Sequence, residues 1–216
     1  MAKRQFGTCF FESYAQISLS ALLGHEFDCL VNIDRPDLQS DDGNSIGIEV
    51  TRAMEESKTA EDALLKDISG ITPAPKDDDF EQILESGYAY GLHEGKYIGV
   101  KELSYWSMAL PLRRILESKV SKVGNGFYGR FDKMGLYVFN RENLREADAI
   151  KAMNYTISLQ RYLDIRYDRL YLADINDLFV CNLEDGLNDG ARLARYPISQ
   201  ESRKAFYEEA LIRQNS

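Results

Sequence analysis

The hydrophobic and polar positions of the chain follow two alternating spacings, and each spacing predicts one kind of element. Between residues 8 and 23 apolar side chains recur every three or four positions and a glycine follows, which is typical of a helix with one buried face. The same spacing predicts further helices over 54–69, 77–87, 109–123, 145–163 and 200–213. The chain is therefore predicted to be rich in helices.

Strands are predicted where apolar residues alternate with polar ones or form a short continuous run. In segment 46–51, Ile46, Ile48 and Val50 lie on one face, and Glu49 lies on the other. Further strands are predicted at 27–33, 97–103, 134–139, 169–173 and 178–181. Strands that alternate with helices indicate an α/β fold, in which we expect 27–33, 46–51 and 135–139 to share one sheet with helix 8–23 on one face.

Length and composition fit one globular domain. The chain has 216 residues, of which 44% are hydrophobic and 28% are charged, and we expect a single domain over 1–216 with a helical insertion at about 54–105. No apolar run approaches the ~18 residues of a membrane span, and the N-terminal segment lacks the apolar stretch of a signal peptide. Three cysteines without a C-x-x-C pair predict buried free thiols, so we expect a cytoplasmic protein.

The charge is unevenly distributed along the chain. The formal net charge of −9 argues against a protein that coats nucleic acid nonspecifically, because phosphate binding depends on lysine and arginine. Residues 101–170, however, carry 13 Lys and Arg against 8 Asp and Glu, a local net charge of +5. This basic segment is either a solvated helical face or a surface opposite an acidic site.

Several motifs that resemble functional signatures have simpler interpretations. The segment 124–129 spells G-x-G-x-x-G, but it follows a predicted helix and precedes a strand, the reverse of a dinucleotide-binding site, so it is interpreted as a helix stop and loop. His25 and His93 have no partner at metal-ligand spacing and are interpreted as surface or capping histidines. No nucleophile motif of acyl-transfer enzymes is present in the sequence.

One group of acidic residues has a spacing that suggests chemistry. Asp37 follows Pro36, and Glu49 comes twelve residues later inside the apolar strand 46–51. Asp37 is either a turn-forming residue or a ligand, and Glu49 either points to solvent or is buried. A buried carboxylate is costly unless it is paired or bound to a metal, which favours a site.

The order of these elements resembles the core of the PD-(D/E)XK superfamily, the restriction-endonuclease-like nucleases. A helix carrying Glu12, a strand, Pro-Asp, a turn and Ile-Gly-Ile-Glu-Val-Thr follow one another over about residues 8–70, with a weaker echo in the later helix and strand. The resemblance implies a mixed central sheet flanked by helices. It also implies that Asp37 and Glu49 are catalytic and bind Mg²⁺ or Mn²⁺, with Glu12 as a third metal ligand. In such a site the ion activates water and offsets charge on the phosphate.

The chain departs from the superfamily pattern at the lysine. That residue is expected two positions after the glutamate, where this sequence has Thr51. Some relatives supply the lysine from a neighbouring helix, and the resemblance then points to Lys119 and Lys122 as catalytic candidates. The alternative interpretation is that both are solvated lysines on a helix face.

Three functions remain open at this stage. The first is a divergent Mg²⁺-dependent nuclease that hydrolyses phosphodiesters of DNA or RNA. The second is a catalytically inactive protein of the same fold that acts as a binding or scaffold module, which Thr51 favours. The third is an unrelated α/β protein in which the motif arose by chance. We expect at least one ammonium group, from Lys119 or Lys122, to approach Asp37 and Glu49 if the first is correct.

Overall fold

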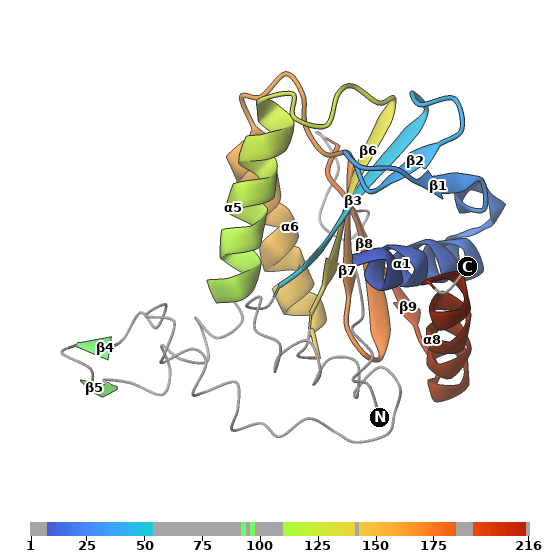
Figure 1. The fold of residues 1–216 in the computed structure, drawn as a ribbon. Coiled ribbons are helices and arrows are strands. Elements are labelled where there is room, and N and C mark those ends of the chain that lie inside the picture. Colours follow the sequence, from blue (N-terminus) through green and yellow to red (C-terminus); the bar gives the residue numbers. More distant parts are fainter. Residues whose placement is uncertain are drawn as a thin grey trace.

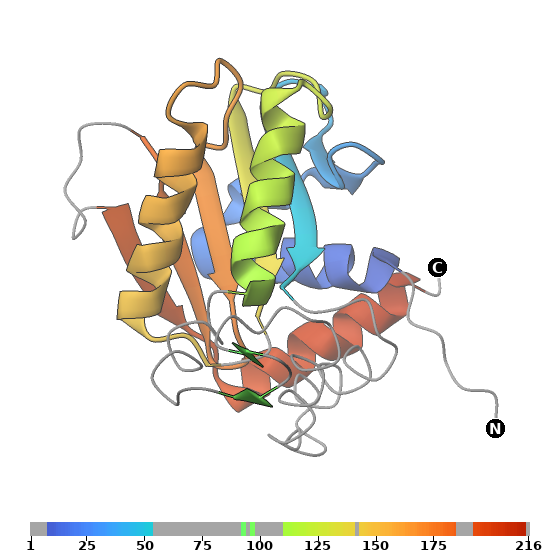
Figure 2. The ribbon, with the colours of Figure 1, turned by 90° about the vertical axis from the view of Figure 1, so that its left-hand side faces the viewer.

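A seven-stranded mixed sheet forms the centre of the protein, with helices on both faces (Figures 1 and 2). The computed structural model describes residues 8–53, 92–93, 96–97, 110–140, 143–184 and 192–214. Helices α1 and α8 cover one face of the sheet, and α5 and α6 cover the other (Figure 1). The predicted α/β class and the mixed sheet flanked by helices are confirmed.

The elements follow the predicted order closely. The helices are α1 (Thr8–Leu23), the 3₁₀ turn η1 (His25–Phe27), α5 (Leu110–Gly124), α6 (Glu146–Gln160) and α8 (Gln200–Gln214). The strands of the large sheet are β1 (Leu30–Asn32), β2 (Leu38–Ser40), β3 (Ile46–Arg52), β6 (Lys133–Phe139), β7 (Arg169–Ala173), β8 (Asp177–Asn182) and β9 (Leu193–Pro197). A separate two-stranded pair consists of β4 (Leu92–His93) and β5 (Lys96–Tyr97).

The sheet order is β1-β2-β3-β6-β7-β8-β9. Strands β1, β2 and β3 form an antiparallel meander, whereas β3, β6 and β7 run parallel to one another. Parallel neighbours need a crossover connection, and α5 and α6 lie in the connections before β6 and β7. Strand β3 is therefore the point where the meander meets the parallel part of the sheet.

Two buried clusters hold the layers together. On the side of α1 and α8 the core is rich in aromatic rings, such as Phe10, Tyr14 and Tyr137. On the side of α5 and α6 it is mainly aliphatic and includes Leu116 and Leu136. Neighbouring residues of one strand join different clusters, as the two-residue period of strands requires.

Some predictions need correction. The strand expected at 27–33 spans only Leu30–Asn32, because residues 25–27 form a 3₁₀ turn. The carboxylate of Asp28, which follows this turn, accepts a hydrogen bond from the Ser20 hydroxyl and pairs with His25. Strands β2 and β9 were not predicted. Cys181 is buried and free as expected, but the free thiol of Cys29 is exposed.

Other predictions concern parts of the chain that are not described. The helices expected at 54–69 and 77–87, and most of the strand expected at 97–103, lie outside the described residues, as does most of the expected insertion at about 54–105. Within the described ranges, no helix combines the length and the apolar character needed to cross a membrane.

Candidate functional site

The candidate site lies at the edge of β3, next to the point where β2 stops pairing with it. Strand β2 pairs only with Gly47 and Ile48 of β3. Asp37 directly precedes β2, and its Oδ2 accepts a hydrogen bond of 2.7 Å from the backbone N–H of Val50. The Asp37 carboxylate therefore continues the pairing along β3 and is held beside Glu49.

Glu49 and Lys119 meet across the interface between β3 and α5. The Nζ atom of Lys119 lies 2.5 Å from Oε1 of Glu49, and the two side chains are 14% and 9% exposed. Figure 2 shows α5 (yellow-green) in front of the sheet beside β3 (cyan), which explains how residues 70 positions apart come together. Glu49 is buried as expected, and the prediction that an ammonium group approaches the acidic pair is confirmed for Lys119.

Lys122 does not join this group. Its side chain is exposed, and its Nζ lies over the ring of Phe127, 5.4 Å from the ring centroid. Lys119 and Lys122 are three residues apart on α5, yet only Lys119 faces Glu49. The structure therefore separates two candidates that the sequence treated alike.

Glu12 lies on α1, close enough to Asp37 and Glu49 for their charges to interact with its own. Burial raises the pKa of Glu12, a hydrogen bond donated by the side-chain amide of Asn32 opposes the increase, and the charges of Glu49 and Asp34 add to it. Among the described residues, no three His, Cys, Asp or Glu side chains are grouped closely enough to hold a metal ion. The metal-binding roles of Glu12, Asp37 and Glu49 therefore stay predictions.

The environment of Asp37 makes its negative charge unfavourable. Burial is the main cause that raises the pKa of Asp37 to about 7, and the charge of Glu49 is the second. The hydrogen bond from Val50 and the charge of Lys119 act in the opposite direction but do not compensate. The environment of Asp37 therefore favours its protonated form over the carboxylate, compared with an exposed aspartate.

A residue that the sequence analysis missed also belongs to the site. Tyr128 is only 4% exposed, and its buried hydroxyl has no hydrogen-bond partner among the described residues. Glu49 and Tyr167 lie close enough to influence its pKa, although neither meets the geometry of a hydrogen bond. Burial and the charge of Glu49 raise the pKa of Tyr128, so this group stays a protonated donor beside the carboxylate. A tyrosine just after a glycine-rich helix stop was the only sequence signal.

Gly47 allows Pro36, and therefore Asp37, to lie against β3. A Cβ atom at Gly47 would be 2.8 Å from the ring of Phe131 and 2.9 Å from Cγ of Pro36, both too close for ordinary packing. A larger residue must therefore displace one of these neighbours.

We expect Gly47→Ala to lower the free energy of unfolding by about 1–3 kcal/mol and to change the titration of Asp37, followed by NMR of the carboxyl carbon. Gly135→Ala is the matched control, because its Cβ would lie 2.9 Å from the ring of Tyr171. It should destabilise the protein but leave the Asp37 titration unchanged. The same titration curve for Asp37 in both variants would show that Gly47 does not position it.

No model of a protein family, no curated protein and no solved structure matches this chain. The site brings together Asp37, Glu49, Lys119 and Tyr128, and Glu12 lies close enough for the charge of Glu49 to raise its pKa.

Proposed function

We propose that this protein is a divergent member of the PD-(D/E)XK superfamily and hydrolyses nucleic-acid phosphodiesters with Mg²⁺ or Mn²⁺. The observation that carries the proposal is the contact of 2.5 Å between Lys119 and Glu49, beside Asp37. This contact, together with Asp37 beside it, brings two carboxylates and a lysine close to one another, and these are the groups that the resemblance requires. The lysine comes from α5, whereas the expected position on β3 holds Thr51.

The order of elements around the site supports the same proposal. A helix carrying Glu12 precedes the antiparallel strands β1, β2 and β3, and later in the chain α5 precedes β6, which runs parallel to β3. This order agrees with the one on which the resemblance is based, including the later helix and strand, whereas the helix expected directly after strand 46–51 lies outside the described residues. Asp37 lies in the connection directly before the second strand of the meander, and Glu49 lies in the third strand.

The residues of the site fit a hard divalent cation. Mg²⁺ prefers oxygen ligands, is commonly held by one or two carboxylates and keeps several waters, so Asp37 and Glu49 suffice to hold it. Burial and the charges of Glu49 and Glu12 oppose ionisation of Asp37, and a cation would relieve this repulsion. When bound, the ion would activate water and offset negative charge on the phosphate.

The side chains of the protein have separate roles in this proposal. Lys119, held by Glu49, would stabilise the extra negative charge that develops on the phosphate in the transition state. The backbone N–H of Val50 orients the Asp37 carboxylate. The buried, protonated Tyr128 hydroxyl lies near Glu49 and is a potential donor to a bound phosphate or water.

The alternative is a binding or scaffold module that has lost catalysis. Thr51 favours it, because threonine provides neither the charge nor the reach of a lysine. In this case Lys119 would serve only to neutralise the buried Glu49 carboxylate. The two functions differ in whether phosphodiesters are cut.

Cleavage of labelled oligonucleotides tests the proposal directly. We expect the wild-type protein to cut DNA or RNA with Mn²⁺ or Mg²⁺, to lose this activity in EDTA, and to be slowed at least about 100-fold by Glu49→Gln. Glu117→Gln is the matched control, because Glu117 is exposed on the same helix as Lys119 and pairs with Arg113. It should cut like the wild type. No cleavage of single-stranded or duplex DNA or RNA by the folded wild type would favour the binding module.

A further inference from the structure

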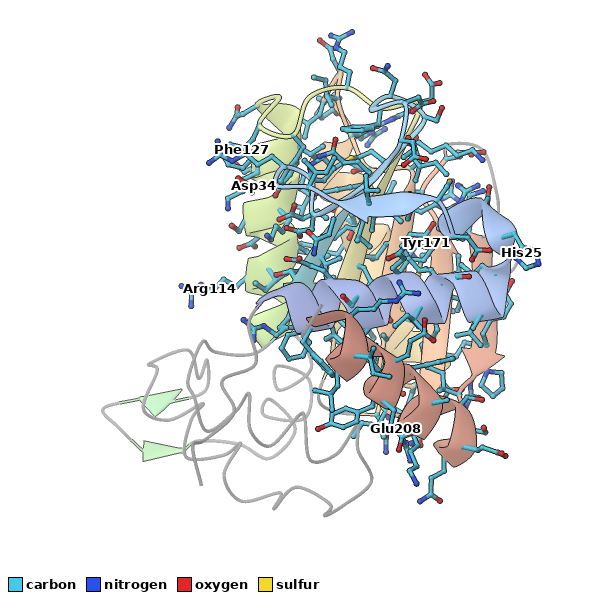
Figure 3. The ribbon with its side chains drawn as sticks, turned by 45° about the vertical axis from the view of Figure 1, so that its right-hand side comes forward. His25, Asp34, Arg114, Phe127, Tyr171 and Glu208 are labelled. Atoms are coloured by element: carbon cyan, nitrogen blue, oxygen red, sulfur yellow. The ribbon has the colours of Figure 1, made fainter. Side chains whose placement is uncertain are left out.

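An exposed aromatic ring flanked by two cations lies beside the candidate site. Phe127 is 46% exposed, and the Arg35 guanidinium carbon and the Lys122 Nζ lie 5.1 Å and 5.4 Å from its ring centroid. Figure 3 shows Phe127 next to Asp34, the neighbour of Arg35 in the chain, near one end of α5. We call Arg35, Lys122 and Phe127 the aromatic–basic surface.

The glycine-rich segment after α5 fixes the position of Phe127. Gly126 has a φ of 72°, and its N–H donates to the Val123 carbonyl at 2.9 Å. The N–H of Phe127 donates to the Lys122 carbonyl at 3.1 Å, which completes a Schellman motif. This motif places the residue after the glycine over the last turn of the helix, so the G-x-G-x-x-G segment serves to stop α5 and to present Phe127.

The helix stop alone does not explain the whole surface. Arg35 comes from the distant connection between β1 and β2 and has a φ of 73°, which residues with a side chain rarely adopt. Its guanidinium nevertheless lies over the same ring as Lys122. Phe127 stays about half exposed even with both cations beside its ring.

Residues of the aromatic–basic surface are close sequence neighbours of residues in the candidate site. Arg35 precedes Asp37 by two residues, and Lys122 follows Lys119 by three on α5. The ring of Phe127 packs edge-on against Tyr128, with centroids 5.2 Å apart, and Tyr128 lies close enough to Glu49 for the charge of that carboxylate to raise the tyrosine's pKa. A strand bound on this surface would therefore extend towards Glu49.

We propose that the aromatic–basic surface binds single-stranded nucleic acid, with an unpaired base stacked on Phe127 and neighbouring phosphates on Arg35 and Lys122. The inference rests on the proposed function, because it names the substrate class of that site. Stacking on a side chain requires an unpaired base, since the faces of bases within a duplex are already covered. Two cations, one of which also pairs with Asp34 at 3.2 Å, are few for a surface that binds duplex by charge alone.

Fluorescence anisotropy in EDTA tests binding without cleavage, using a labelled oligothymidine of about 20 nucleotides and a duplex of the same length. We expect the wild type to bind the single strand at least about 10-fold more tightly than the duplex. Phe127→Leu keeps an apolar residue in the helix stop but removes the aromatic face, and should weaken single-strand binding about 10-fold. Phe127→Trp should bind like the wild type.

Tyr162→Ala is the matched control, because Tyr162 is 89% exposed and has the Arg161 guanidinium 5.7 Å from its ring centroid. This variant should bind like the wild type. Unchanged binding by Phe127→Leu, equal loss in Tyr162→Ala, or equal affinity for duplex would each overturn the inference. Thermal denaturation establishes that each variant is folded.

The result also separates this inference from the proposed function. Binding that depends on Phe127, in a wild-type protein that cuts nothing with Mn²⁺, would support the surface and contradict the nuclease. Metal-dependent cleavage together with binding that does not change in Phe127→Leu would support the nuclease and contradict the surface.

Discussion

Changing Lys119 to methionine is expected to lower the free energy of unfolding by about 3–5 kcal/mol at pH 8, because a buried carboxylate loses its partner. Glu49 is only 9% exposed and pairs with Lys119 at 2.5 Å, and the carboxyl group of Asp37 lies close enough for the two negative charges to repel each other. Urea denaturation measures the change. Lys122→Met, on the exposed side of the same helix, should change stability by less than about 0.5 kcal/mol.

The double variant Lys119→Met with Glu49→Gln separates charge from packing. Since it removes both partners, it should recover much of the stability lost in Lys119→Met. A single variant as stable as the wild type would show that the ion pair does not form in solution.

The same Lys119 variant decides between enzyme and binding module. If Lys119 stabilises transition-state charge, Lys119→Met should cut about 10²–10³-fold more slowly and still bind Mn²⁺, measured by calorimetry. Loss of Mn²⁺ binding together with cleavage would indicate that Lys119 only shapes the site. The stability measurement above establishes the conditions in which the variant is folded.

Changing Asp37 to asparagine is expected to stabilise the metal-free protein at pH 8 by about 1–3 kcal/mol, measured by urea denaturation in EDTA. Burial and the charge of Glu49 raise the pKa of Asp37 from 3.8 to about 7. Asparagine has no charge to be repelled, and its side-chain oxygen still accepts the hydrogen bond from Val50. The variant should also lose the stabilisation that Mn²⁺ gives to the wild type.

The pH dependence of this effect has a definite sign. A carboxyl group whose pKa is higher in the folded state binds its proton more tightly there, so its contribution to stability is complete below about pH 4 and is lost as the pH rises through about 7. The gain from Asp37→Asn should therefore be larger at pH 8 than at pH 5.

Asp42 provides a control of opposite sign. Hydrogen bonds from Ser45 and Ser40 lower the pKa of Asp42, so Asp42→Asn should destabilise the protein at pH 8.

A loss of stability in Asp37→Asn at pH 8 would show that Asp37 acts mainly as a strand-edge acceptor.

Much of the fold follows from local sequence pattern. Residues 8–23 and 46–51 have the apolar spacing of a helix and a strand, and the structure places α1 and β3 there. These patterns are reliable because long elements with one buried face need the same spacing in any fold. Strand β2 has three residues directly after Pro36 and Asp37, and β9 has no buried residue, so neither shows a clear apolar pattern; pairing with neighbouring strands makes them part of the sheet.

The candidate site was predictable only in part. The sequence by itself indicated that Glu49 is not a surface residue, because a carboxylate within the apolar strand 46–51 is costly unless it is paired or bound to a metal, and the resemblance pointed to Asp37 as the second carboxylate. It also limited the lysine to Lys119 or Lys122 through the resemblance. Only the tertiary structure decided between them, because the rotation of α5 on the sheet turns Lys119 to Glu49 and leaves Lys122 over Phe127. Tyr128 was likewise identified only from the tertiary structure, because contacts between distant segments depend on how helices and strands pack together.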